Sequence, residues 1–253
     1  MSRLLRIVFG TVVLTYLALC AMLFFIQRSL IYFPQADSGT GGATITLTSG
    51  KERVLVSTRS EDGPLALIYF GGNAEDVSFA MPSLSVAFPD HAIYLLHYRG
   101  YGGSSGSPSE KALFADALSL FDKVRAEHPR IDLIGRSLGS GVAVYVASRR
   151  PVSRLVLVTP YDSLVGIAQL QFPYMPVKWL LTDRFESWRY APQVTAPTLI
   201  IAAENDEIIP RASTELLASR FRRGVTSYKV VPAVGHNSIS SSPEYVRLLK
   251  GET

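Results

Sequence analysis

The sequence predicts an α/β protein with a mostly parallel, doubly wound sheet, preceded by one apolar N-terminal helix. Short runs rich in β-branched and aromatic residues alternate with longer segments of helical spacing. The short runs are apolar throughout, which is typical of strands buried on both faces. The third observation is a charge-free stretch at residues 7–26. A length of 253 residues suits one large domain or two small ones.

The apolar stretch 7–26 is predicted to be a transmembrane signal anchor. As a helix it reaches about 30 Å, the thickness of a bilayer's hydrocarbon core. The alternatives are a cleaved signal peptide and a lipoprotein anchor on Cys20. No small-residue cleavage site precedes Gln27, and Leu19 stands where a lipoprotein needs a small residue. Both observations favour an anchor that is retained.

The distribution of charge predicts the orientation of this anchor. Of a formal net charge of +4, much comes from Arg3, Arg6 and Arg28, and residues 1–36 contain no acidic residue. The positive-inside rule then predicts a cytoplasmic N-terminus and a folded domain outside, which is the periplasm in a bacterium. Because this positive charge lies beside the apolar stretch, no nucleic-acid partner is predicted. Cys20 is the only cysteine, so no internal disulfide can form.

A juxtamembrane connector is predicted at 27–43, with a flexible part at 38–43, and a folded domain at 44–253. The predicted strands are Val54–Ser57, Leu65–Phe70, Ala92–His97, Ile131–Ile134, Leu155–Thr159, Thr198–Ala203 and Ser227–Val231. The predicted helices are Glu75–Phe88, Lys111–Glu127, Leu138–Ser148, Ala212–Phe221 and Pro243–Lys250. Residues 161–190 contain prolines and aromatic residues but no strand pattern. We interpret them as a lid inserted between two strands, above the carboxyl ends of the sheet.

Two stretches match the G-x-S-x-G pattern, which exposes a nucleophilic serine on a sharp strand-to-helix turn. Gly135-Arg136-Ser137-Leu138-Gly139 follows a predicted strand and precedes an apolar helix. Gly102-Gly103-Ser104-Ser105-Gly106 follows no apolar strand, and Pro108 stands where a helix would begin. We therefore predict Ser137 as the nucleophile and Ser104 as part of a loop. The alternative for Ser137 is a tight glycine turn without catalysis.

A serine hydroxyl becomes nucleophilic when a histidine accepts its proton and a carboxylate orients that histidine. In doubly wound hydrolases the chain order is serine, acid, histidine. Of the four histidines, only His236 lies downstream of every suitable acid, in a loop that follows a strand. His128 stands before a proline and is interpreted as a solvated helix end, and His91 lies at the entry of a strand.

Three acidic residues follow the sixth predicted strand. Asp206 has the best spacing for a turn that points back to the site, and it is predicted as the acid. Glu204 is the alternative, and Glu207 is interpreted as a helix cap or a solvated side chain. Asp162 and Asp183 belong to the insertion and are expected to cap its own helices.

An oxyanion hole needs backbone N–H donors where negative charge develops. Leu138 is predicted to supply one, because it follows the nucleophile at a helix N-terminus. Asn73 is predicted to supply the other, in the turn Gly71-Gly72-Asn73-Ala74 that follows a buried strand. This second pattern also fits an ordinary turn.

These motifs together resemble the α/β-hydrolase superfamily. The resemblance covers about residues 27–250 and rests on motifs in the family's order, which are Phe70-Gly71-Gly72-Asn73-Ala74, His97-Tyr98-Arg99-Gly100-Tyr101-Gly102, Gly135-Arg136-Ser137-Leu138-Gly139, Asp206-Glu207-Ile208-Ile209-Pro210 and Gly235-His236-Asn237. The chain is similar to a membrane-anchored branch related to serine-aminopeptidase-like hydrolases and depalmitoylase-type acyl thioesterases. The resemblance implies the α/β-hydrolase fold with a short helical lid.

Two positions depart from that branch. It often has His-Gly-Asn where this chain has Gly71-Gly72-Asn73, and it usually has Asp where this chain has His97. Both positions are expected near the pocket mouth. They would change the substrate preference and leave the triad of Ser137, Asp206 and His236 intact.

The predicted function is a membrane-anchored serine hydrolase that cleaves carboxylic esters or thioesters through an acyl-enzyme. One alternative is a serine aminopeptidase-like enzyme, with Glu186 or Asp162 binding a free amino terminus. Another is a catalytically silent binding protein on the same scaffold, which an intact triad disfavours. The sequence contains no metal-ligand spacing, phosphate-binding loop or dinucleotide pattern, so neither cofactor nor metal is predicted.

The insertion 161–190 contains more apolar side chains than one small helix can bury. Part of this surface is expected to line a pocket for a small or lipid-like acyl substrate, or to rest on the bilayer. The alternative is a helical hairpin packed on the sheet without lipid contact.

Overall fold

The computed structural model describes residues 2–36, 38 and 42–251. Within them an eight-stranded sheet has the strand order β1-β2-β4-β3-β5-β6-β7-β8. The strands are β1 (Ala43–Ser49), β2 (Glu52–Arg59), β3 (Leu65–Phe70), β4 (Ala92–Leu96), β5 (Arg130–Arg136), β6 (Arg154–Val158), β7 (Thr198–Ala203) and β8 (Thr226–Val231). β2 pairs antiparallel with β1 and β4, and the other neighbouring pairs are parallel. The mostly parallel sheet is confirmed.

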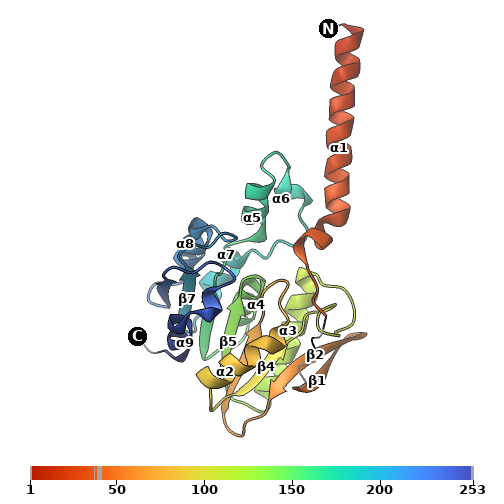
Figure 1. Ribbon diagram of the computed structural model, residues 1–253. Helices are drawn as coiled ribbons and strands as arrows, with labels where there is room; N and C mark the ends of the chain where they lie inside the picture. The colour runs from red at the N-terminus through yellow and green to blue at the C-terminus, as the bar shows by residue number, and fades with distance from the viewer. Residues whose placement is uncertain (1, 37, 39–41, 252–253) are drawn as a thin grey trace.

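Helices cover both faces of the sheet (Figure 1). On one face, α2 (Met81–Ala87) and α9 (Pro243–Lys250) share a core with the strands. On the other face lie α3 (Glu110–Arg125), α4 (Leu138–Ala147) and α8 (Arg211–Arg220). The 3-10 helices are η1 (Val77–Ala80), η2 (Ala191–Gln193) and η3 (Ile239–Ser241). This double cover explains why the central strands are apolar without alternation.

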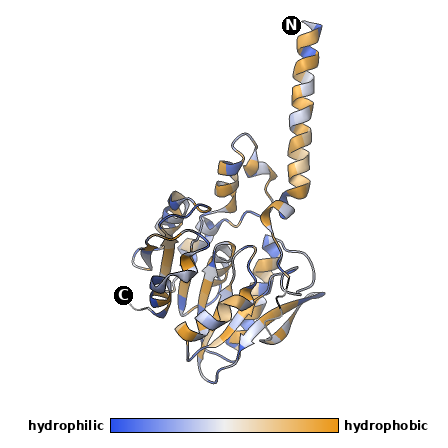
Figure 2. Cartoon of the chain, in the orientation of Figure 1, coloured by the Kyte–Doolittle hydropathy of each residue, from blue (hydrophilic) through white to orange (hydrophobic). Residues whose placement is uncertain are grey.

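The lid, residues 161–190, is helical: α5 (Leu164–Gln171), α6 (Val177–Leu180) and α7 (Ser187–Tyr190). It rises above the carboxyl ends of the strands, as expected (Figure 1). α1 (Arg3–Ile31) is a single helix of 29 residues that extends beyond the folded domain. It is apolar along most of its length (Figure 2) and, by length and composition, a candidate membrane span.

The structure differs from the predicted elements at three places. β1 was not predicted, because its sequence ATITLTS is rich in threonine and buries only Leu47 fully at the edge of the sheet. The helix expected at 75–88 begins at Val77, because the Asp76 side chain accepts the Ser78 N–H and caps η1. Helix α1 continues through residues 27–31 of the expected connector. Residues 39–41 of its flexible part lie outside the described residues.

Candidate active site

Ser137 stands on the sharp turn between β5 and α4. Its backbone has φ 48° and ψ −117°, a conformation that costs a non-glycine residue strain. The flanking glycines permit this turn. A Cβ atom on Gly139 would lie 2.1 Å from the carbonyl oxygen of Phe70, and one on Gly135 would lie 2.5 Å from the carbonyl oxygen of Gly139. The small residues of the motif are therefore required by close backbone packing.

His236 lies within hydrogen-bonding distance of both Ser137 and Asp206. His236 Nε2 is 2.9 Å from Ser137 Oγ, and His236 Nδ1 is 2.9 Å and 3.0 Å from the two carboxylate oxygens of Asp206. The His236 and Asp206 side chains are only 4% and 8% exposed. In this arrangement His236 can accept the Ser137 proton while Asp206 holds the imidazole and offsets its developing positive charge.

The turn after β7 keeps Asp206 ionised. Its Oδ1 accepts the backbone N–H groups of Ile208 and Ile209 at 3.0 and 2.7 Å. Burial by itself raises the pKa of this carboxyl, but the hydrogen bonds from His236 and from these two N–H groups outweigh it. The pKa of Asp206 therefore lies below its ordinary value, and the carboxylate form is favoured.

The two other carboxylates after β7 hold the loop that carries His236. Glu204 accepts the Ala233 N–H at 2.8 Å, and Glu207 accepts the His236 N–H at 3.0 Å. That bond holds the pKa of Glu207 below its ordinary value. A Cβ atom on Gly235 would lie 2.6 Å from Glu207 Oε2, so the glycine allows this close approach. Glu207 is exposed, as the interpretation of a solvated side chain expects, but its bond to the His236 N–H was not predicted.

Asn73 and Leu138, the predicted oxyanion donors, line one cavity together with Ser137. Leu138 is the first residue of α4, and its N–H belongs to the first turn, which has no intrahelical acceptor. The Gly72 N–H donates to Glu75 at 2.6 Å, and Glu75 is also ion-paired with Arg136 at 3.0 Å. Glu75 therefore ties the turn after β3 to the turn that carries Ser137.

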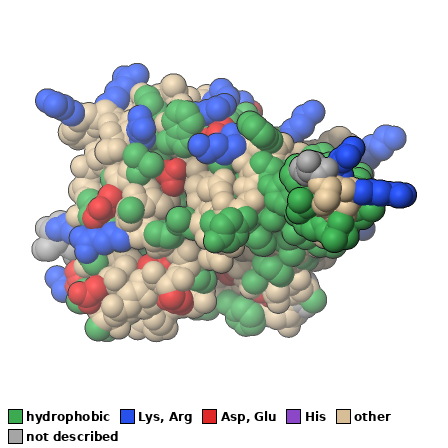
Figure 3. All heavy atoms as spheres, turned by 90° about the horizontal axis from the view of Figure 1, so that it is seen from above, with side chains coloured by type: hydrophobic (Ala, Val, Ile, Leu, Met, Phe, Trp, Pro, Cys, Tyr) green, Lys and Arg blue, Asp and Glu red, His purple; other side chains and the backbone are tan. Residues whose placement is uncertain are grey.

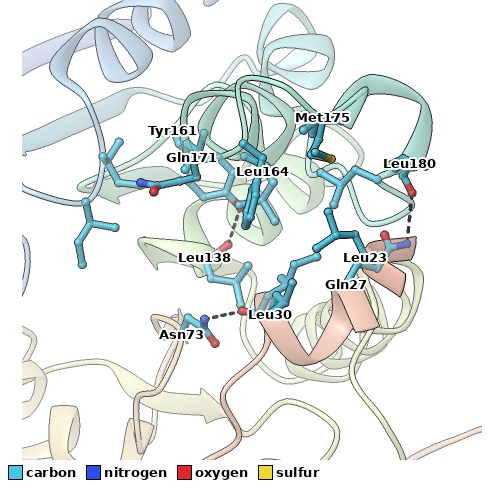
Figure 4. Close-up of a pocket in the computed structure, with 18 of the residues that line it drawn as sticks. Leu23, Gln27, Leu30, Asn73, Leu138, Tyr161, Leu164, Gln171, Met175 and Leu180 are labelled. Carbon is cyan, nitrogen blue, oxygen red and sulfur yellow. Dashed lines mark hydrogen bonds between the residues drawn. The ribbon is translucent and has the colours of Figure 1, made fainter. Parts of the chain in front are cut away.

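The Asn73 side chain connects this turn to the end of α1. Its Nδ2 donates to the carbonyl oxygen of Ile31 at 2.5 Å (Figure 4). Its Oδ1 accepts the Phe33 N–H at 3.1 Å and the Tyr101 hydroxyl at 2.7 Å. These hydrogen bonds hold the Asn73 side chain against the end of α1, so the backbone N–H of Asn73 is the group left to bind an oxyanion.

Ser104 and His97 contact β2 and are not among the residues that line the cavity beside Ser137. Ser104 is buried, accepts the Leu55 N–H and donates to the His97 carbonyl oxygen. The His97 ring forms a hydrogen bond with Ser57 at 2.8 Å and packs against Gly102, where a Cβ atom would lie 1.9 Å from Nδ1. Interpreting Ser104 as a loop residue agrees with this position, but the expectation that His97 lies at the pocket mouth was wrong.

Three further expectations from the sequence were wrong. Asp162 caps no lid helix, because Ser163 is the N-cap of α5 and the Asp162 carboxylate accepts the Ser163 and Ser213 hydroxyls. His128 is buried, and its two ring nitrogens contact the Gly63 carbonyl oxygen and the Tyr94 hydroxyl at 2.8 and 3.1 Å. Asp183 caps no lid helix, because its carboxylate pairs with Arg28 and accepts the Tyr32 hydroxyl. Burial, together with the nearby Asp183 charge, raises the pKa of Tyr32.

An apolar cavity of about 320 Å³ opens beside Ser137. Its walls come from α1, from α5 and α6 of the lid, and from the turn after β7 (Figure 4). Among the residues that the structure describes, no charged one lines it. The lining residues are Leu23, Gln27, Leu30, Ile31, Phe33, Asn73, Ser137, Leu138, Tyr161, Leu164, Ile167, Ala168, Gln171, Phe172, Met175, Val177, Leu180, Leu181, Ile208 and Ile209. Such a cavity suits an uncharged, apolar group.

Comparison with known proteins agrees with this geometry. A family model described as the alpha/beta hydrolase fold matches residues 67–187. An uncharacterized protein of Mycobacterium tuberculosis is 36% identical over 230 residues, which cover 83% of this chain and 80% of that protein. Alpha/beta hydrolase domain-containing protein 17B of Xenopus tropicalis is 32% identical over 200 residues, with coverages of 76% and 67%. The chain belongs to the α/β-hydrolase family.

Among solved structures, the hydrolase is similar to a bacterial membrane phospholipase A. The TM-score is 0.67 at 15% sequence identity, and the alignment covers 98% of this chain and 94% of the other. At this identity the likeness shows the fold alone. A coverage of 98% includes most of α1, so the likeness extends to the N-terminal helix.

Two features of the hydrolase's site escaped the sequence reasoning. Glu75 follows the Gly-Gly-Asn turn in the sequence and was available as a candidate, but nothing local indicates that it binds Arg136. The second feature is the contribution of α1 to the cavity. Only Gln27, a polar residue at the end of the apolar stretch, indicates weakly that this part of the helix contacts other protein groups. Across residues 2–36, 38 and 42–251, no group of three or more His, Cys, Asp and Glu side chains is arranged to hold a metal ion.

Proposed function

We propose that this α/β-hydrolase is a membrane-anchored serine hydrolase that cleaves carboxylic esters or thioesters of apolar acyl groups. The observation that carries the proposal is the position of Ser137. Its hydroxyl is hydrogen-bonded to His236, and Ser137 lines a cavity whose described lining residues are all uncharged. An acyl chain fits such a cavity, because burying its methylene groups is favourable and leaves no charge unpaired.

In the proposed reaction, Ser137 Oγ attacks the carbonyl carbon of the ester while His236 Nε2 takes the hydroxyl proton. Asp206 keeps the Nδ1 proton on the opposite side of the imidazole and stabilises the imidazolium. The backbone N–H groups of Leu138 and Asn73 donate to the oxyanion. The tetrahedral intermediate collapses, and the alcohol or thiol leaves with the proton from His236. Water, activated by the same histidine, then hydrolyses the acyl-serine ester.

The aminopeptidase alternative lacks a carboxylate at the pocket for a free amino terminus. Glu186 is ion-paired with Arg184 and Arg189, and Asp162 accepts the Ser213 hydroxyl. Neither acid lines the cavity beside Ser137. We therefore expect esters of medium-length acyl chains to be cleaved faster than acetyl esters and amino-acid amides. Faster cleavage of an aminoacyl amide than of any ester would favour the peptidase.

Covalent labelling tests the proposal. A fluorophosphonate probe should label the detergent-solubilised protein, and Ser137→Ala should abolish both the label and ester hydrolysis. Loss of a triad serine typically lowers turnover about 10⁶-fold. Ser104→Ala, in the second G-x-S-x-G stretch, is the matched control and should remain labelled. If Ser104→Ala removed the label from a folded protein, the assignment of Ser137 would be wrong. If wild-type protein were never labelled, the silent binding protein would be favoured.

We further propose that residues 7–26 anchor the hydrolase in a membrane, with the N-terminus in the cytoplasm and the catalytic domain, 44–253, outside. The charge-free sequence and the length of α1 support this. Alkaline carbonate should not extract the protein from membranes, and peptides upstream of Gln27 should be present in the mature chain. Added protease should digest the domain in intact spheroplasts. Digestion only after lysis would reverse the proposed orientation.

A further inference from the structure

One face of α1 packs against the lid over a long stretch. The contact begins at Tyr16, whose hydroxyl donates to the Tyr174 carbonyl oxygen at 2.9 Å. It continues through Leu23, which lines the cavity with the lid helices, and ends at Arg28, which pairs with Asp183. The buried Cys20 lies on the same face. The lid therefore lies along about 18 Å of α1, measured from Tyr16 to Arg28.

This contact leaves too little of α1 to cross a bilayer alone. Residues 3–15, the part before the first lid contact, reach about 20 Å, whereas the hydrocarbon core of a bilayer is about 30 Å thick. A span that fits lies between Arg6 and Arg28, where the sequence has no charged residue. That span includes the segment of α1 beside the lid, so a helix crossing the membrane carries part of the lid into the hydrocarbon.

The lid tip, defined as residues 170–181, has the surface that such a position requires. Four large apolar or aromatic side chains are exposed on it, beside the polar Gln171 and Lys178: Leu170 (66% exposed), Phe172 (42%), Tyr174 (86%) and Trp179 (88%). The only charged residue of the tip is Lys178, which is long enough to reach the headgroups. Tyrosine and tryptophan favour the boundary between lipid and water. From above, hydrophobic side chains gather on α1 and beside it (Figure 3).

The polar groups between α1 and the lid tip are already paired. Gln27 donates through Nε2 to the carbonyl oxygens of Phe24 and Leu180, and its Oε1 accepts the Thr182 N–H and hydroxyl. This amide is buried and makes hydrogen bonds through both its oxygen and its nitrogen, so lipid contact would leave neither unsatisfied. The ion pair of Arg28 with Asp183 lies at the base of the tip and marks the level at which charged groups begin.

We propose that the lid tip is immersed in the leaflet next to the catalytic domain, so that the cavity between α1, α5 and α6 receives acyl chains directly from the bilayer. The inference rests on the proposed membrane anchoring and narrows the substrate class to acyl esters or thioesters held in a membrane. The acyl chain then passes from lipid to the cavity beside Ser137 without crossing water.

The chain's two tryptophans allow a direct test, because Trp179 lies on the lid tip, whereas Trp188 lies outside the tip, in α7 beside Arg220 of α8. Trp188→Phe leaves only Trp179, and Trp179→Phe leaves only Trp188. Each full-length variant is reconstituted into phosphatidylcholine vesicles that contain lipids brominated along the acyl chain. Because tryptophan favours the boundary between lipid and water, Trp179 should lose fluorescence in brominated lipid, and acrylamide in the water should quench it little. Trp188 should be insensitive to brominated lipid.

The outcomes separate this inference from the proposals on which it rests. If the protein floats with the vesicles and acrylamide quenches Trp179 as strongly as Trp188, the lid tip faces water and the inference is overturned. Protection of Trp179 from both quenchers means that protein, such as a second copy, covers the tip, which also overturns it. If the protein does not float with the vesicles, the proposed membrane anchoring is refuted. If the fluorophosphonate does not label the wild-type protein, only the proposed hydrolase activity is refuted.

Discussion

Leu23 offers a way to change the length of the proposed acyl pocket without touching the catalytic groups. It lines the cavity near Met175 and Leu180, whereas Leu30 lies near Asn73 and Leu138 (Figure 4). The two leucines are two turns of α1 apart, about 10 Å. A larger side chain at Leu23 should therefore block the far part of the cavity and leave the part near Ser137 open.

The expected magnitude follows from the apolar surface that the substrate can no longer bury. If the indole of Leu23→Trp displaces two methylene groups, the loss is about 1.6 kcal/mol, at about 0.8 kcal/mol for each methylene. This corresponds to about a 15-fold lower kcat/KM for the longest acyl chains. The acetyl ester, which does not reach Leu23, should react at the wild-type rate. The acyl-length optimum should move to shorter chains.

The assay is hydrolysis of p-nitrophenyl esters from acetyl to palmitoyl by the full-length protein in detergent. Leu14→Trp is the matched control, because Leu14 is exposed and lies two and a half turns from Leu23, on the opposite side of α1. Its acyl-length profile should equal that of the wild type. An unchanged profile for Leu23→Trp, in a protein still labelled at Ser137, would refute the role of α1 in the pocket. An equal loss for every ester would show that the substitution disturbs the catalytic groups.

Three other predictions test the site and the fold. Asp206→Asn should lower kcat about 10⁴-fold, because the amide favours the wrong imidazole tautomer, while Glu204→Gln should change it little; the reverse ranking would make Glu204 the acid. Gly139→Ala should abolish fluorophosphonate labelling, because the added Cβ atom would lie 2.1 Å from the Phe70 carbonyl oxygen, and a fully labelled variant would contradict this packing argument. Burial raises the pKa of Asp132 to about 6, so the folded state binds its proton more tightly than the unfolded state, and stability is lost as the pH rises from about 4 through 6. The Asp132→Asn variant should therefore melt at the wild-type temperature at pH 4 but up to several degrees above it at pH 8, since the pKa shift is worth about 3 kcal/mol at most. An equal difference in melting temperature at both pH values would contradict the ionisation argument.

The groups that the proposed reaction needs could be predicted from local sequence patterns. The glycines around Ser137 are required by backbone contacts within a few ångströms, so their spacing in the sequence is itself the signal. The same holds for the buried strands, whose continuous apolar runs reflect cover on both faces. Asp206 and His236 could be predicted because each follows a strand and they come in the chain order serine, acid, histidine, and the carboxyl ends of parallel strands meet at one edge of the sheet.

Contacts between distant segments could not be read in this way, because side-chain periodicity reports only that a face is covered and not by what. His128 next to a proline looks like a solvated helix end, yet Tyr94 and Gly63 enclose it. The apolar sequence of α1 predicts a membrane span whether or not another segment of the chain packs against the helix. Its pairing with the lid, through Gln27 and a segment more than 150 residues away, exists only in the folded chain. That pairing makes the end of the helix a wall of the cavity beside Ser137.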